Sequence, residues 1–204
     1  MDFEEATKKV LETDDLYQFS EYTYDGEIYK TFVNTPQTLH ELLEYGKKTR
    51  QWEEFIIYEN ERITYSEFIE KVNSVAAFLQ KELGVKKGDK VAIAMRNFPE
   101  YPILLMGIVS IGAIVVFVNA WWTTSEMEYG FNDSAAKICF ADNERLNVIL
   151  PFSQDHGVKL IGIRSEHGKN VLDYEKDVAS YPSKNLRVPN IDPKDDFGIM
   201  YTSG

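Results

Sequence analysis

The chain has 204 residues, of which 44% are hydrophobic and 27% charged, so it can bury a good core and is typical of a globular protein. Its formal net charge of -11 argues against a nucleic-acid backbone or an anionic membrane as the main partner, although a local loop can still bind a small phosphate compound. Cys139 is the only cysteine, which excludes an internal disulfide and indicates a reducing compartment. It lies in a strand-like run, where a buried packing thiol is favoured over a nucleophile.

The first sixty residues read as short elements that cover a larger domain. Asp2 to Leu11 predicts a short amphipathic helix, and a second helix is expected from Thr35 to about Tyr45. Two strand-like runs, 55–58 and 62–65, flank a short polar turn and predict a β-hairpin.

A capping box marks the start of the next helix. The Thr64 hydroxyl can accept the amide proton of Glu67, while the Glu67 carboxylate reaches back to Thr64. Gly84 ends this helix, residues 90–95 form a strand, and Asn97 is expected to cap the helix after that. The buried face of the first of these helices consists of residues spaced by three and four, namely Phe68, Val72, Val75, Ala76, Leu79 and Leu83.

The stretch from Glu100 to Glu126 carries no charge between its two ends and must be tested as a membrane span. Its apolar part, 102–118, has a length near the lower limit for crossing a bilayer. However, Gly112 divides it, and residues 114–118 are β-branched and aromatic. We therefore interpret it as a buried helix, a glycine cap and a parallel strand of an α/β core.

Helices and strands continue to alternate to the end of the chain. A second capping box, Thr123 to Glu126, starts a short helix. The elements expected after it are a strand at 137–141, a helix at 144–152, a strand at 158–163, a helix near 171–179, a loop at 185–195 and a strand at 196–201. This alternation predicts an α/β fold with a layered, mostly parallel sheet and helices on both faces. Ligands of such sheets bind at the carboxyl ends of the strands.

The last strand is followed by Thr202, Ser203 and Gly204. Two hydroxyl groups and a flexible residue after a buried strand let backbone N–H groups turn toward an anion, which is how a phosphate-binding loop begins. By itself this tripeptide is a weak signal, because a complete loop needs more glycine and usually a lysine.

Four segments in a fixed order strengthen that interpretation. They are Ile63–Phe68 (ITYSEF), Gly84–Ile93 (GVKKGDKVAI), Gly107–Asn119 followed by Glu126–Tyr129, and Met200–Gly204 (MYTSG). In order and spacing they resemble the N-terminal part of the AMP-forming acyl-activating enzymes, which include acyl- and aryl-CoA synthetases, peptide-synthetase adenylation domains and beetle luciferases.

The resemblance implies domains, substrates and site residues. Residues 1–34 are expected to form a covering segment, and 35–204 the front part of the large N-terminal AMP-binding domain. The parent protein is expected to activate a carboxylic acid with ATP and Mg²⁺ and to transfer the acyl group to CoA. Thr202, Ser203 and Gly204 match the nucleotide-phosphate loop, Tyr201 is expected only to pack, and no position matches a catalytic residue. The expected compartment is the cytoplasm or an organelle lumen such as the peroxisome, in fatty-acid or aryl-acid metabolism, with no nucleic acid and no transmembrane span.

Several alternatives stay open at this point. The chain can be a non-catalytic α/β interaction module derived from the same fold, or belong to the amino-acid-adenylating or luciferase-like branch. Asn119 stands where amino-acid-activating members usually carry Asp, which favours the CoA ligases. A free-standing nucleotide-binding domain of the flavodoxin or dinucleotide type is disfavoured, because no Gly-x-Gly-x-x-Gly follows the strand at 90–95.

Other conspicuous residues read as structural. Trp121 and Trp122 are interpreted as packing under the following helix. The three histidines, at positions 40, 156 and 167, have no ligand spacing, so a shared metal site is not expected. Asp195 and Asp196 are interpreted as the solvated start of the last strand.

The resemblance also suggests a limit on the chain by itself. The rest of the phosphate loop, the adenine- and ribose-binding motifs, the glutamate associated with Mg²⁺ and the C-terminal lid are absent from these 204 residues. We therefore expect no adenylating activity from the chain alone, although the parent protein is expected to be active. Detectable pyrophosphate exchange by the purified chain would contradict this.

Overall fold

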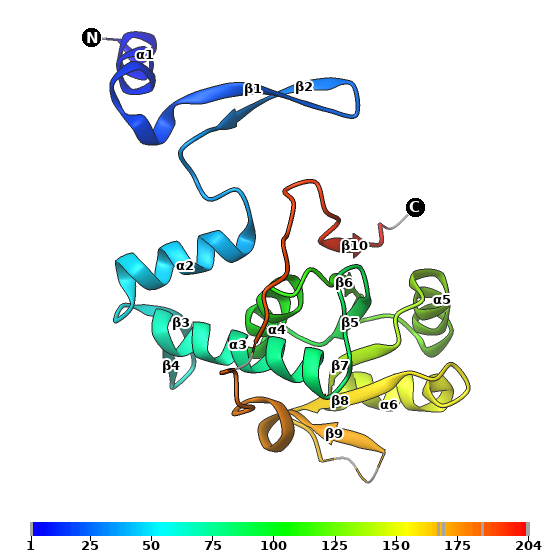
Figure 1. Cartoon of the computed structure of the whole chain (residues 1–204). Coiled ribbons are helices and arrows are strands. Elements are labelled where there is room, and N and C mark those ends of the chain that lie inside the picture. Colours follow the sequence, from blue (N-terminus) through cyan, green and yellow to red (C-terminus); the bar gives the residue numbers. More distant parts are fainter. Residues whose placement is uncertain (1, 167, 169, 185, 203–204) are drawn as a thin grey trace. The chain divides into compact units, whose positions relative to one another are not determined.

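The computed structural model describes residues 2–166, 168, 170–184 and 186–202 (Figure 1). The chain forms two compact units, Met1–Gln37 and Thr38–Gly204. The assignment of 1–34 as a covering segment stays a prediction.

The first unit consists of one helix and one hairpin. Helix α1 (Phe3–Thr13) confirms the predicted amphipathic helix, and a 3₁₀ turn (Asp15–Tyr17) leads into strands β1 (Phe19–Tyr24) and β2 (Glu27–Phe32), which pair antiparallel. This hairpin was not predicted from the sequence. The sequence feature that indicates the hairpin is the pair Asp25-Gly26. Both residues adopt positive φ angles (50° and 82°) and form the two-residue turn that suits the twist of a hairpin.

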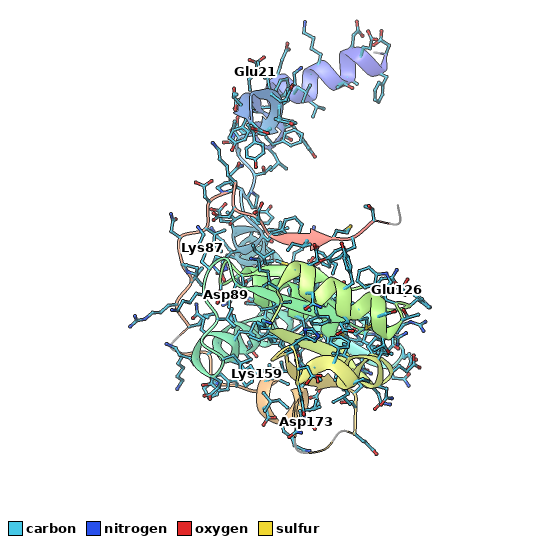
Figure 2. All side chains as sticks on the ribbon, turned by 90° about the vertical axis from the view of Figure 1, so that its right-hand side faces the viewer. Glu21, Lys87, Asp89, Glu126, Lys159 and Asp173 are labelled. Carbon is cyan, nitrogen blue, oxygen red and sulfur yellow. The ribbon has the colours of Figure 1, made fainter. Side chains whose placement is uncertain are left out.

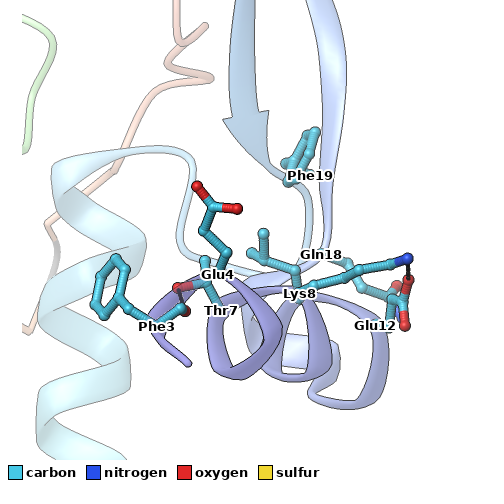
Figure 3. Close-up of a pocket in the computed structure, with 8 residues that line it drawn as sticks. Phe3, Glu4, Thr7, Lys8, Glu12, Gln18 and Phe19 are labelled. Carbon is cyan, nitrogen blue, oxygen red and sulfur yellow. Dashed lines mark hydrogen bonds and ion pairs between the residues drawn. The ribbon is translucent and has the colours of Figure 1, made fainter. Parts of the chain in front are cut away.

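A groove of about 660 Å³ lies between α1 and the start of β1 (Figure 3). Its charged side chains include Lys8 and Glu12, which face each other 3.9 Å apart across one turn of α1. The remaining lining residues are Phe3, Glu4, Thr7, Leu11, Gln18 and Phe19. Because all of these residues come from one helix and the segment just after it, the groove does not combine groups from several strand ends.

The second unit is built on a six-stranded sheet in which every neighbouring pair is parallel. Its order is β10-β6-β5-β7-β8-β9. The strands are β5 (Lys90–Ala94), β6 (Ile114–Phe117), β7 (Ile138–Asp142), β8 (Lys159–Ile163), β9 (Val171–Asp173) and β10 (Gly198–Met200). The predicted layered α/β fold is confirmed.

Helices cover both faces of this sheet (Figure 1). Helices α3 (Tyr65–Lys81) and α4 (Glu100–Val109) lie on one face, and α5 (Thr124–Ser134) and α6 (Asn143–Ser153) on the other. Helix α2 (Leu39–Arg50) packs on α3 and α4, and the predicted hairpin, β3 (Glu54–Tyr58) with β4 (Glu61–Thr64), contacts α3.

Alternation along the strands divides the interior into two cores. In β5, Val91 and Ile93 face the core beneath α3 and α4, whereas Ala92 and Ala94 face the core beneath α5 and α6. Cys139 belongs to the second core and is fully buried, which confirms the prediction of a packing thiol. Burial strongly raises the pKa of the Cys139 thiol, so the sulfur stays protonated and unreactive.

Both predicted capping boxes are present. The Thr64 amide donates to Glu67 Oε2 at 2.8 Å, and the Thr123 amide donates to Glu126 Oε2 at 2.7 Å. These backbone hydrogen bonds lower the pKa of both glutamates. Glu126, labelled in Figure 2, thereby fixes the start of α5 directly after the loop that leaves β6.

The long apolar stretch forms a helix and a strand of the α/β core, as predicted. Helix α4 ends at Val109, Gly112 adopts a φ of 70°, and β6 follows at Ile114. Among the described residues, no helix combines the length and the apolar character needed to cross a membrane.

Two local predictions are wrong. Asn97 does not cap α4: Pro99 holds the N-cap position without a side-chain bond, because a backbone turn, with the Tyr101 amide bonded to the Phe98 carbonyl, starts this helix. The helix expected at 171–179 is instead the edge strand β9 and a single π-helical turn, Tyr174–Val178. Residues Val171–Asp173 pair with β8 at the edge of the sheet. The backbone hydrogen bonds of this pairing replace those that a helix would form.

Substituting Gly107 tests the close approach of α3 and α4. Replacing a mid-helix glycine by alanine ordinarily stabilises a helix by about 1 kcal/mol. Here the added methyl group would lie 2.6 Å from Val75 Cγ1 and 3.2 Å from the Val72 carbonyl oxygen. Overpacking of this kind costs about 1–3 kcal/mol, so Gly107→Ala should lower the free energy of unfolding in a urea titration. Glu70→Ala, at an exposed position of α3, is the control and should change the free energy of unfolding little. A higher free energy of unfolding in Gly107→Ala would contradict the close packing of α3 and α4.

Candidate functional site

A cleft opens where the connections of the sheet diverge. Strand β5 lies between β6 and β7 in the sheet. The chain runs from β5 through α4 to β6, whereas from β7 it runs through α6 to β8. Because α4 and α6 cover opposite faces, the loops after β5 and β7 leave in opposite directions, and ligands of parallel sheets bind at such a point.

This carboxyl-edge cleft has a volume of about 660 Å³. It draws its lining from the segments that follow four parallel strands and from the end of β3. The lining residues are Tyr58, Met95, Arg96, Asn97, Phe98, Ala120, Trp121, Asp142, Asn143, Glu144, Arg145 and Arg164. Two of them were singled out from the sequence, Asn97 as a helix cap and Trp121 as a packing residue, whereas Asp142 and the three arginines were not.

Asp142 holds the floor of the cleft together. This last residue of β7 is buried, and its Oδ2 accepts the Arg96 amide at 2.9 Å. Its Oδ1 accepts the Arg145 amide at 3.0 Å and thereby caps α6. One carboxylate therefore fixes the loop after β5 and the start of α6 at the same time.

Arg145 extends this network to the loop after β6. Its buried guanidinium donates from Nε to the Ala120 carbonyl at 2.8 Å and pairs through Nη1 with Asp142 at 3.2 Å and with Glu144 at 2.7 Å. Because two carboxylates neutralise this arginine, its charge orders the loop and is not free for a ligand.

Arg164 ties the other rim of the cleft to the fold. It follows β8 with a φ of 48°, a left-handed conformation that is unusual for a residue with a side chain. Its Nε donates to both Glu100 oxygens at 2.9 and 3.1 Å, and its Nη2 to both Glu61 oxygens at 2.8 and 2.9 Å. Burial alone would lower the pKa of Arg164, but these two carboxylates outweigh it and raise that pKa. The ring of Phe98 lies 5.2 Å from the guanidinium.

Arg96, which lies beside Trp121, differs from Arg145 and Arg164, whose charges are neutralised by carboxylates. The Arg96 guanidinium lies 5.5 Å from the Trp121 ring, and no carboxylate among the described residues forms an ion pair with it. The Trp121 side chain is 76% exposed, and its backbone amide is held by Asn119 Oδ1 at 3.0 Å. An exposed aromatic ring beside a cation that has no carboxylate partner among the described residues suits a planar aromatic ligand that carries negative charge.

Trp121 and Trp122 thus differ in role, and the packing interpretation holds for the second alone. Trp122 packs in the core beneath α5 and α6, close to Gly130, where an added methyl group would lie 2.7 Å from Trp122 Cζ3. Trp121 lines the cleft instead. The signal for it, and for Arg96 and Asp142, is a polar or aromatic residue at the end of a buried strand or in the short loop that follows it.

The candidate phosphate loop begins at the same edge of the sheet. Strand β10 pairs in parallel with β6, with Met200 opposite Phe117, so Thr202 follows a carboxyl end and is exposed. Ser203 and Gly204 lie outside the described residues. Tyr201 does more than pack: its hydroxyl donates to Asp133 Oδ2 at 2.9 Å and to the Gly130 carbonyl at 3.0 Å.

The residues described do not suit a magnesium ion. Among them, no three His, Cys, Asp or Glu side chains gather closely enough to hold a metal. His156 pairs with Glu128 at 2.7 Å, and His167 lies outside the described part of the chain. Asp195 forms a 2.6 Å ion pair with Lys87, a residue labelled in Figure 2, so it is a tether and not simply a solvated carboxylate. None of these residues is therefore proposed as a metal ligand.

The family of the chain follows from its sequence. The model of the AMP-binding enzyme family matches residues 43–204, which is most of the second unit. The chain belongs to the AMP-binding enzyme family. The identification made from the four segments is confirmed.

Curated members of this family show the same similarity over shorter ranges. The chain is 40% identical over 100 residues to a long-chain-fatty-acid–CoA ligase of Salmonella typhimurium, a match that covers 49% of this chain and 18% of the ligase. It is 31% identical over 149 residues to an acetyl-coenzyme A synthetase of Bacillus subtilis, covering 71% of this chain and 26% of that enzyme. The chain therefore spans less than a third of the length of either relative.

Solved structures share the fold of this chain. A crystal structure of an anthranilate CoA ligase in complex with anthranoyl-AMP matches with a TM-score of 0.76 at 23% identity, over 81% of this chain and 32% of that one. A benzoate CoA ligase of Burkholderia xenovorans matches with a TM-score of 0.64 at 20% identity, over 74% of this chain and 30% of that one.

Proposed function

We propose that the protein carrying this chain is an AMP-forming acid–thiol ligase. In the first step, a carboxylate oxygen of the acid attacks the α-phosphorus of ATP, and pyrophosphate leaves with the electron pair of the broken P–O bond. In the second step, the CoA thiol attacks the acyl carbon, loses its proton and releases AMP. The family match over residues 43–204 carries the proposal, and the two curated relatives are named for reactions of this class. The proposed compartment is the cytoplasm or an organelle lumen such as the peroxisome.

In the proposed reaction, the nucleotide phosphates of ATP bind at Thr202, Ser203 and Gly204. Supporting this, Thr202 follows a parallel strand at the ligand-binding edge of the sheet. The hydroxyl and the backbone N–H groups of such a loop stabilise the negative charge that develops on the leaving pyrophosphate. Mg²⁺ is proposed as the ion that accompanies ATP, with its protein ligands outside the residues described.

We test this function with the protein at the length of its relatives, using exchange of labelled pyrophosphate into ATP with a panel of aliphatic and aromatic acids. Exchange that depends on one class of acid is the expected result, because formation of the adenylate is reversible. Thr202→Ala should slow it, whereas Thr49→Ala, at an exposed position of α2, should not. A folded protein that catalyses no exchange with any acid would contradict the proposal.

The carboxyl-edge cleft is proposed as the site for the nucleotide end of CoA, the second substrate that carries an adenine. The phosphate loop after β10 serves ATP, while the cleft lies at β5 and β7, beyond β6 in the order of the sheet. Adenine can stack on Trp121, and Arg96 can pair with a phosphate group.

Trp121→Ala tests the cleft. Loss of a stacked base costs about 1–3 kcal/mol, so the KM for CoA should rise about tenfold while the KM for ATP stays unchanged. Trp52→Ala is a matched control, because Trp52 is 77% exposed and lies in the turn between α2 and β3. An equal KM for CoA in the two variants would contradict the proposal that CoA binds in this cleft.

A further inference from the structure

Tyr201 is the residue immediately before the candidate phosphate loop, and it is held from two directions. Its neighbour Met200 ends β10, which among the described strands pairs with β6 alone. The Tyr201 side chain, in contrast, reaches α5, on the face of the sheet opposite α4. The pairing of Met200 with β6 and the side-chain bonds of Tyr201 to α5 thus connect the end of β10 to a strand and to a helix.

The ring of Tyr201 is fixed by packing. It lies edge-on to Trp122, with the ring centroids 5.2 Å apart and an angle of 65° between the planes. Trp122 is itself seated against Gly130, where a side chain would not fit. A glycine in α5 therefore makes room for the tryptophan that supports Tyr201.

The hydroxyl of Tyr201 is fixed by hydrogen bonding. It has one proton, which Asp133 Oδ2 at 2.9 Å and the Gly130 carbonyl at 3.0 Å compete for or share. The charged oxygen of Asp133 is the stronger acceptor. Burial, together with the bond to Asp133, raises the pKa of Tyr201 to about 12, so the hydroxyl remains a donor at any working pH.

These contacts constrain the direction in which the chain leaves the sheet. β10 has only three residues, and a short edge strand by itself leaves the following residue free to swing. The contacts of Tyr201 with α5 remove that freedom one residue before Thr202. A loop that must place N–H groups within hydrogen-bond distance of a phosphate depends on such a fixed starting point.

We propose that Tyr201 is a positioning residue for the nucleotide phosphates of ATP: the bond from its hydroxyl to Asp133 fixes the start of the phosphate loop at Thr202. The inference rests on the proposed function, because it needs ATP to bind at this loop. It assigns Tyr201 no contact with the reacting atoms.

Tyr201→Phe in the protein at the length of its relatives is the direct test, because it removes the hydroxyl and keeps the ring that packs on Trp122. We expect the KM for ATP in pyrophosphate exchange to rise about tenfold, as one hydrogen bond to a charged group is lost, while the KM for the acid and the melting temperature change little. Asp133→Ala should match Tyr201→Phe, and the double variant should be no worse than either. Asp133→Asn keeps an acceptor oxygen and should restore most of the ATP affinity.

Tyr129→Phe is the matched control, since Tyr129 is an exposed tyrosine of α5. An unchanged KM for ATP in Tyr201→Phe would overturn the inference. So would a parallel rise in the KM for ATP and for the acid with a lower melting temperature, because that pattern belongs to a merely structural residue. Absence of acid-dependent exchange in the unaltered protein would instead reject the proposed function, and this inference with it.

Discussion

Burial of the central strands on both faces is the constraint on which the second unit depends. Strands β5 to β8 run parallel between two layers of helices, so along their length they carry almost only apolar side chains. Polar chemistry is confined to the ends of these strands. Because parallel strands all end at one edge, the segments after β5, β6, β7, β8 and β10 gather there, although the first follows Ala94 and the last follows Met200.

Asp142 shows how this edge is made rigid. A buried carboxylate without partners would cost several kcal/mol, and the fold offsets that cost with two backbone amides and the Arg145 guanidinium. Arg164 is compensated in the same way by Glu61 and Glu100. The remaining arginine of the cleft, Arg96, faces Trp121, which gives an acidic protein a local place for an anion.

The sequence was most informative where local and long-range signals agree. The capping boxes at Thr64 and Thr123 and the glycine at 112 were predicted correctly because short-range hydrogen bonds and backbone conformation decide them. The strand β9 was mistaken for a helix, since pairing with a neighbouring strand is invisible in a local pattern. The hairpin at 19–32 was missed although its turn residues signal it.

The candidate site was predictable only in part, for the same reason. The prediction of a phosphate loop at Thr202, Ser203 and Gly204 came from a contiguous motif, and of these residues Thr202 is described at the carboxyl edge. The cleft combines Arg96, Trp121 and Asp142, which no motif joins. Their proximity depends on the strand order, in which β7 lies beside β5 and not beside β6.

The central claim is that substrates bind at the carboxyl edge of this sheet, and amide hydrogen exchange with and without ATP and CoA tests it most directly. We predict slower exchange at 95–98, 119–122, 142–145 and 200–202 when the substrates are present. The turn at 86–89, which precedes β5 at the amino edge, should exchange at the same rate in both states. Protection at 86–89 without protection after the strand ends would contradict the account.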